Sequence, residues 1–250
     1  MATVKRAVIM AAGKGERMRP LTLTTPKPLI RVNGIRMIDS VISALHRNGI
    51  FEIYVVIGYQ KELFARLEAD YSGLKLIENP DYDRCNNIAS LYYAREHLSD
   101  CIILDGDQII RNPAVLTPEF ERSGYNAVWT DEETDEWLLT VENEVITCCS
   151  RTGGKDGWQL YSISCWTAED GAKLCRHLEL EYEERKNTSV YWDDVPLFCH
   201  PEDYKLGIRE MSRYDVVEID TLEQLAAEDP GYLTMLERAD CHGSRHAVSQ

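Results

Sequence analysis

The residues with the clearest chemistry lie in one loop near the N-terminus, "MAAGKGERMRPLTLTTPKPL", which spans residues 10–29. The loop combines glycines, which let backbone N–H groups approach an anion, with basic side chains that can neutralise phosphates: Gly13, Gly15, Lys14, Arg17 and Lys27. Residues 1–36 hold eight basic side chains and a single acid, whereas the whole chain carries a net charge of −15. This local excess of positive charge predicts a compact anionic ligand.

Two familiar phosphate-binding motifs do not fit this loop. A P-loop needs a serine or threonine after its Gly-Lys pair, and here Gly15 follows Lys14. A dinucleotide fingerprint needs a third glycine at the start of a long helix, but Met18 stands at that position and Pro20 breaks the helix. The remaining interpretation is a loop that leaves the carboxyl end of a first strand and binds a triphosphate. Pro26 and Pro28 fix the backbone on both sides of Lys27, so the lysine side chain can be held in one direction.

A second chemical signal is the pair of carboxylates in "CIILDGDQII". Asp105 and Asp107 follow a buried strand and lie on the same side of an extended chain. A divalent cation with oxygen ligands is the usual reason for such repulsive spacing.

Alternating apolar segments must position these residues. The pattern predicts buried strands over residues 6–12, 52–58 and 101–107, a further strand over residues 74–79, and helices over residues 37–49, 60–71 and 86–98. This alternation is typical of an α/β fold with a mostly parallel mixed sheet and helices on both faces.

The alternation of predicted strands and helices ends after Asp107. Strands arranged as a meander are predicted within residues 125–132, 136–150 and 157–166, followed by a helix over residues 168–185 and a strand over residues 216–220. Residues 110–215 are therefore interpreted as a β-rich elaboration on the substrate side of one domain, which spans residues 1–228. Residues 229–250 are expected to form a polar C-terminal tail.

Composition excludes several classes of protein. The net charge of −15 opposes binding to nucleic acid or to an anionic membrane surface. No apolar stretch is long enough to insert into a membrane, and the N-terminus lacks a signal-peptide pattern, so a cytoplasmic location is expected. The eight cysteines contain no C-x-x-C pair and are expected to be reduced thiols.

The loop as a whole resembles the signature of the nucleotidylyltransferases, through "MAAGKGERMRPLT" followed by "TPKPL". This resemblance implies a Rossmann-like nucleotidyltransferase fold and makes Arg17 and Lys27 the catalytic residues. It implies a Mg²⁺ ion on Asp107 and on Asp220 of "VVEIDT". The implied nucleotide-binding residues are Ala11, Ala12, Gly13, Lys14, Gly15, Asn87 and Ser90.

More of the chain, up to about residue 228, resembles the bacterial CTP:phosphocholine cytidylyltransferases through "NNIASLYY", "DGDQ", "TDEW", "YWDD" and "YDVVEIDTLEQL". A cationic acceptor is recognised by aromatic faces and carboxylates. The acceptor-binding candidates combine both kinds of side chain: Glu136, Trp137, Tyr161, Tyr191, Trp192, Asp193 and Asp194. Asp194 and the Tyr161-Ser162 pair depart from the phosphocholine pattern, which keeps the similar 2-aminoethylphosphonate cytidylyltransferases open.

The sequence thus predicts a Mg²⁺-dependent cytidylyltransferase that transfers CMP from CTP to phosphocholine or 2-aminoethylphosphonate and releases pyrophosphate. A sugar-1-phosphate nucleotidylyltransferase is one alternative, and a non-catalytic nucleotide-sensing subunit on the same fold is another. The oligomeric state is open, with a homodimer as one candidate.

Overall fold

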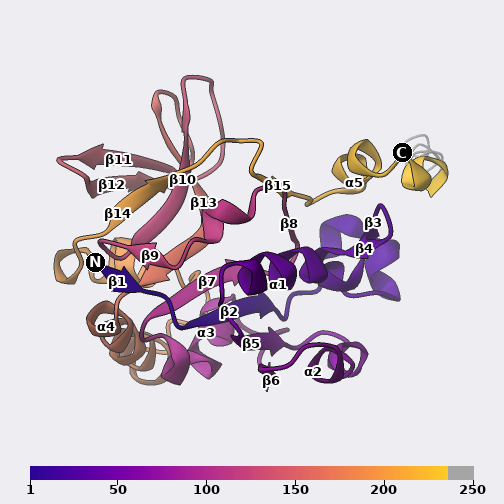
Figure 1. Cartoon of the computed structure of the whole chain (residues 1–250). Helices are drawn as coiled ribbons and strands as arrows, with labels where there is room; N and C mark the ends of the chain where they lie inside the picture. The colour runs from indigo at the N-terminus through magenta and orange to yellow at the C-terminus, as the bar shows by residue number, and fades with distance from the viewer. Residues whose placement is uncertain (236–250) are drawn as a thin grey trace, which may run out of the picture.

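A single large sheet organises the protein (Figure 1). The computed structural model describes residues 1–235. The sheet has nine strands, and its main path runs β12-β11-β13-β7-β2-β5-β6, while β10 pairs with β13 and β14 pairs with β10. The predicted α/β class with a mixed sheet is confirmed.

The parallel half of the sheet contains the first four predicted strands. They are β2 (Arg6–Ala11), β5 (Glu52–Ile57), β6 (Leu74–Glu78) and β7 (Cys101–Asp105). β2 lies between β5 and β7 and runs parallel to both. The carboxyl ends of these three strands therefore lie next to one another. The loop of residues 10–29 and the Asp-Gly-Asp turn therefore leave the same edge of the sheet.

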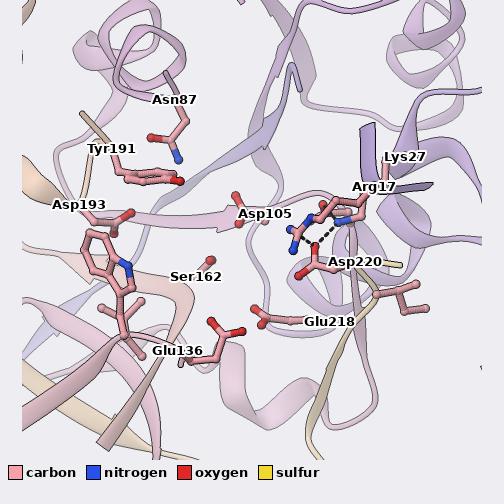
Figure 2. A pocket seen from close by; sticks show the side chains of 14 residues that line it. Arg17, Lys27, Asn87, Asp105, Glu136, Ser162, Tyr191, Asp193, Glu218 and Asp220 are labelled. Carbon is pink, nitrogen blue, oxygen red and sulfur yellow. Dashed lines mark hydrogen bonds and ion pairs between the residues drawn. The ribbon is translucent and has the colours of Figure 1, made fainter. Parts of the chain in front are cut away.

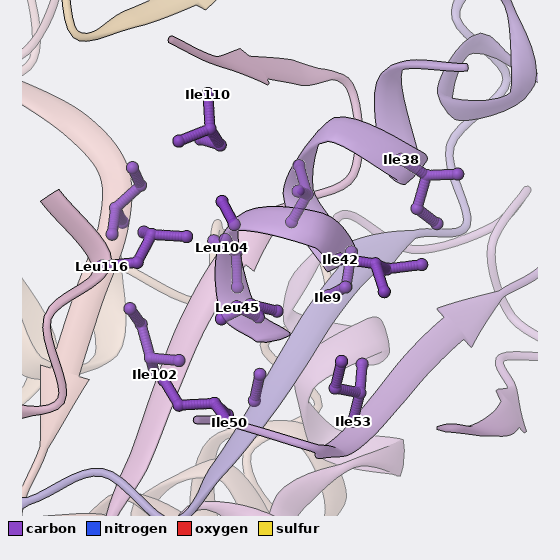
Figure 3. Packing of buried hydrophobic residues seen from close by; sticks show 14 of the residues in the cluster. Ile9, Ile38, Ile42, Leu45, Ile50, Ile53, Ile102, Leu104, Ile110 and Leu116 are labelled. Atoms are coloured by element: carbon purple, nitrogen blue, oxygen red, sulfur yellow. The ribbon is translucent and has the colours of Figure 1, made fainter. Parts of the chain in front are cut away.

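Helices cover both faces of this half because the strand residues alternate in direction. Ala7 and Ile9 of β2 join a cluster with α1 (Met37–Arg47) and α2 (Leu67–Asp70). Figure 3 shows Ile9 packed among Ile38, Ile42 and Leu45 of α1. Val8 and Met10 point to the opposite face, where they pack with α3 (Ile88–Tyr93) and α4 (Ala168–Glu179).

Three helices are shorter or less regular than their sequence patterns predict. The segment 60–71 forms a 3-10 helix (Lys61–Phe64) and then the single turn of α2. The segment 86–98 forms α3 and a separate 3-10 turn (Arg95–His97). In both segments, short helical turns are enough to bury the few apolar residues that reach the sheet. A continuous helix is therefore not needed. α4 ends at Glu179 and continues as a π-helical turn (Leu180–Glu184).

The β-rich half contains the predicted strands but is not a meander. Its strands are β10 (Gly124–Thr130), β11 (Leu138–Glu142), β12 (Val145–Ser150), β13 (Gly157–Trp166) and β14 (Gly207–Glu210). β10 pairs with β13 instead of β11, and the ten-residue β13 also pairs with β11 and β7. The long β13 is therefore the bridge that joins the elaboration to the parallel half.

A third cluster fixes the N-terminal loop. β8 (Gln108–Ile110) pairs with β15 (Val216–Glu218), and α5 (Leu222–Glu228) follows. Leu222 and Leu225 pack against Met18 of the loop and against Ile30, which directly follows it. Residues beyond α5 also take part, since a 3-10 turn (Pro230–Tyr232) places the Tyr232 hydroxyl where it donates to the Arg31 carbonyl. The rest of the predicted tail, residues 236–250, lies outside the described residues.

The expectations about membrane-spanning segments and about the cysteines concern the described part of the chain as a whole. Within residues 1–235 no helix combines the length and apolar character needed to cross a membrane. The cysteines in this range are free thiols, while Cys241 lies outside it.

Candidate active site

A cavity of about 270 Å³ lies at the carboxyl ends of β2 and β7. Arg17, Lys27 and Asp220 lie at one end of it, and Tyr191 and Asp193 lie at the other (Figure 2). The position matches the place where open α/β sheets bind ligands. The two ends differ in chemistry, because one carries the cations of the loop and the other carries an aromatic ring and a buried carboxylate.

Lys27 is the central cation of the site. Its Nζ lies 2.6 Å from Asp107 Oδ2 and 2.7 Å from Asp220 Oδ1, and Arg17 contacts the same Asp220 oxygen at 2.9 Å. Only 8% of Lys27 is exposed. Burial by itself lowers the pKa of Lys27, but Asp107 and Asp220 outweigh it and the net pKa is raised. Lys27 is therefore a fixed positive charge.

The loop around Lys27 is held in one shape by its own contacts. Gly15 has φ of +59°, and a Cβ there would lie 3.1 Å from the Lys27 Cβ. Thr22 is buried, and its hydroxyl donates to the Gly15 carbonyl at 2.9 Å. Lys27 begins a 3-10 helix directly after Pro26, which has φ of −51°. These contacts direct the lysine into the cavity, as the bracketing prolines predict.

The carboxylates at the cationic end divide into paired and unpaired groups. Asp107 and Asp220 share Lys27, and Arg17 and Lys27 overcome the effect of burial to lower the pKa of Asp220. Asp105 faces the cavity without such a partner, and burial followed by the charge of Asp107 raises its pKa well above the usual range. Burial also raises the pKa of Glu218 to about 7. Asp107 and Asp220 are therefore the two carboxylates at this end that pair with a cation.

The local structure explains why Asp220 reaches this pair. β15 ends at Glu218, and Ile219 is fully buried in the third cluster. Thr221 then begins α5 with a capping box in which its side chain and that of Gln224 exchange hydrogen bonds with the backbone. Asp220 is thus held between a buried residue and a helix cap, beside the loop that carries Lys27.

The opposite end of the cavity is lined by Trp137, Tyr191 and Asp193. The two rings lie edge to face with centroids 5.8 Å apart. Asp193 Oδ1 is buried and has no hydrogen-bond partner among the described residues. Burial raises the pKa of Asp193 to about 7, with the buried Tyr125 hydroxyl opposing this rise and the charge of Asp194 adding to it. This end of the cavity therefore combines two aromatic rings with a carboxylate, which fits a small cationic group.

Three of the predicted acceptor residues do not reach the cavity. Trp192 is 4% exposed and packs in the core beside Tyr125 and Trp166. Asp194 is buried behind the residues that line the cavity, and its carboxylate pairs with Arg151. Tyr161 lies between two cavity-lining residues of β13 and therefore points to the opposite face of the sheet, where it packs against the cluster beneath α1. Glu136 does line the cavity.

Some of the predicted nucleotide-binding residues line a cavity, and others do not. Ala11, Gly13 and Gly15 line an adjoining cavity of about 580 Å³, together with Arg17 and Lys27. Ala12 is buried in the core, and Lys14 lines neither cavity. Ser90 is buried in α3, where it accepts a hydrogen bond from the Asn79 amide at 2.9 Å. Asn87 lines the first cavity beside Tyr191, at the end that also carries Asp193 (Figure 2).

The two cavities also contain residues that the sequence analysis did not assign to a ligand. They are Leu160, Ser162, Glu218 and Ile219 in the first cavity and Met10, Glu16, Pro28 and Asn86 in the second, while Asp105, which the sequence pairs with Asp107, lines both. Glu218 could have been found, because it stands two positions before Asp220, as Asp105 does before Asp107. Ser162 had no such signal, since its direction depends on the pairing of β13.

Residues 6–124 match the family model described as "Nucleotidyl transferase". A 2-aminoethylphosphonate cytidylyltransferase from Lancefieldella rimae is 37% identical over 232 residues, which is 92% of this chain and 94% of that protein. The chain belongs to the nucleotidyltransferase family. A choline-phosphate cytidylyltransferase from Streptococcus pneumoniae is also similar to this nucleotidyltransferase, at 30% identity over 87% of the chain and 94% of the relative.

Solved structures support the same placement of this nucleotidyltransferase. The CTP:phosphocholine cytidylyltransferase of Streptococcus pneumoniae superposes with a TM-score of 0.80 at 30% identity, over 89% of this chain and 96% of the other. The predicted Rossmann-like nucleotidyltransferase fold is therefore confirmed.

Proposed function

We propose that this nucleotidyltransferase transfers CMP from CTP to 2-aminoethylphosphonate and releases pyrophosphate. The observation that carries the proposal is the cavity with opposite chemistry at its two ends. Arg17 and Lys27 provide the positive charge that a triphosphate needs, while the Asp193 carboxyl group lines the opposite end, where a cation can bind. The similarity to cytidylyltransferases of amino-headed phosphates and phosphonates supports CTP as the nucleotide.

The choice of a primary ammonium rests on what surrounds the acceptor end. A trimethylammonium group has no N–H to donate and is held by several aromatic faces. Here two rings, Trp137 and Tyr191, line the cavity, because Trp192 is in the core. A primary ammonium needs hydrogen-bond acceptors as well, and the Asp193 carboxyl group in the cavity lining provides them.

The reaction itself needs little covalent help from the protein. An oxygen of the acceptor phosphonate attacks the α-phosphorus of CTP, and the bond from that phosphorus to the pyrophosphate oxygen breaks. The acceptor oxygen is already an anion near neutral pH, so no general base is needed. The protein aligns the two phosphorus centres and neutralises the developing charge with Lys27 and Arg17.

A magnesium ion fits the carboxylates at the cationic end. Asp107 and Asp220 already direct oxygens at one common cation, the Lys27 ammonium, and oxygen ligands suit Mg²⁺. We propose that these two aspartates hold the ion, which would neutralise phosphate charge when bound. Lys27 is then free to contact the phosphates.

A pyrophosphate-release screen tests the proposal. It crosses CTP, UTP, ATP and dTTP with 2-aminoethylphosphonate, phosphoethanolamine, phosphocholine and glucose-1-phosphate. We expect the highest kcat/KM for CTP with 2-aminoethylphosphonate. A preference for phosphocholine would reverse the acceptor assignment, and turnover of glucose-1-phosphate alone would support the sugar-phosphate alternative. An absence of turnover with every pair would contradict an enzymatic role.

A further inference from the structure

Arg151 lies outside the cavity, in the turn between β12 and β13, and contacts residues behind the acceptor end. Its guanidinium lies 3.9 Å from the centroid of the Phe198 ring and 2.5 Å from Asp194 Oδ1. Asp194 has a side chain that is 3% exposed, whereas the Arg151 side chain is 46% exposed. The arginine therefore covers a buried charge from the solvent side.

Both partners of Arg151 support aromatic walls of the cavity. Phe198 packs edge to face against Trp137, with centroids 5.7 Å apart. Asp194 Oδ2 accepts a hydrogen bond from the Tyr191 backbone N–H at 2.8 Å. One arginine thus stands behind the two rings that face the acceptor.

The turn that carries Arg151 is attached to the wall that carries Trp137. Thr134 and Gly154 exchange two backbone hydrogen bonds, at 2.9 and 2.8 Å. Gly153 has φ of +71°, and a Cβ there would lie 1.8 Å from the Thr134 carbonyl oxygen, so the two loops touch closely. The Arg151 side chain is then a link from this wall to the separate segment 191–198, which carries Tyr191 and Asp193.

We propose that Arg151 is a positioning residue that fixes the distance between the two walls of the acceptor end and thereby sets its selectivity. This inference rests on the proposed function, since it assigns the acceptor to these walls. Without Arg151, the buried Asp194 carboxylate loses its ion partner and Phe198 loses the planar group stacked on it. The segment that carries Tyr191 and Asp193 can then shift relative to Trp137, while the nucleotide loop is not affected.

Steady-state kinetics separate this role from a general loss of structure. R151A is expected to raise the KM for the acceptor on the order of tenfold, because small displacements of positioning groups are costly, while the KM for CTP stays within about twofold. The preference for 2-aminoethylphosphonate over phosphocholine should decrease. D194N should reproduce both changes, and R151K, which keeps the charge without the planar stack, should restore them only in part.

R111A is the matched control, because Arg111 is 47% exposed and also forms an ion pair at 2.5 Å, with Glu228, away from the acceptor end. If R151A behaved like R111A, or raised both KM values equally, the inference would be wrong. If the wild type instead used a different acceptor, the proposed function would fail, and the same KM comparison with that acceptor would still test Arg151.

A measurement without substrate completes the test. Acrylamide quenching of R151A is compared with that of R151A/W137F, and the wild type with W137F, so that each difference reports Trp137. We expect Trp137 to become more accessible in R151A. Unchanged accessibility would contradict the positioning role whatever the acceptor is.

Discussion

Asp193→Asn tests the chemistry of the acceptor end most directly. Asparagine keeps the size of the side chain and an oxygen acceptor, but removes the charge. A hydrogen bond that involves a charged group contributes about 1.5–3 kcal/mol, and the ammonium keeps such a bond to the asparagine oxygen at the low end of this range. The loss of the ion-paired form, roughly 1–1.5 kcal/mol, corresponds to about a tenfold loss in kcat/KM.

The comparison between two acceptors isolates the hydrogen bond. 2-Aminoethylphosphonate and phosphocholine both lose Coulomb attraction in the variant, but only the primary ammonium loses a hydrogen bond to a carboxylate. We expect the ratio of their kcat/KM values to fall about tenfold in pyrophosphate-release assays, since roughly 1.4 kcal/mol is one decade. Asp135→Asn is the control, because Asp135 is exposed and does not line the cavity. An unchanged ratio would refute the assignment of Asp193 to the ammonium.

The pH profile gives an independent check. Burial raises the pKa of Asp193 to about 7, and only its ionised form attracts an ammonium. The kcat/KM for 2-aminoethylphosphonate should therefore fall as the pH drops below about 7 in the wild type, with a smaller fall in Asp193→Asn. The acceptor itself titrates in this region, as phosphates do near about pH 6, so the difference between the two profiles is the informative quantity.

The other predictions concern the cations, the metal ligands and the aromatic walls. Asp107→Ala should abolish turnover without lowering Tm, and near-normal turnover in saturating Mg²⁺ would contradict its role as a ligand. Lys27→Met should lower kcat on the order of a hundredfold. It should also raise affinity for Mn²⁺ in calorimetry without nucleotide, because Lys27 bridges the two carboxylates. Trp137→Ala should raise the acceptor KM alone, since a desolvated cation–π contact contributes about 2 kcal/mol. Trp192→Ala should instead destabilise the fold in urea by about 3–5 kcal/mol, as for other buried aromatic residues.

The predictable part of the fold follows from local patterns. The apolar runs that become β2, β5 and β7 are recognisable because a strand buried on both faces needs continuous apolar residues. The short helical pieces over residues 60–71 are less predictable, because their length depends on how much sheet surface they must cover. The pairing of β10 with β13 is also decided by tertiary contacts, because a meander would fit the same sequence pattern of strands.

The sequence by itself determined the chemistry of the site, and the tertiary structure decided which residues reach it. Lys27 and Asp107 were identifiable from residue type and spacing, because prolines and an Asp-Gly-Asp turn constrain the backbone locally. In "YWDD", by contrast, Tyr191 and Asp193 face the cavity, while the side chains between and after them are buried. Composition cannot show this alternation, because the direction of each side chain is set by packing against β13, α3 and α4, which are distant in the sequence.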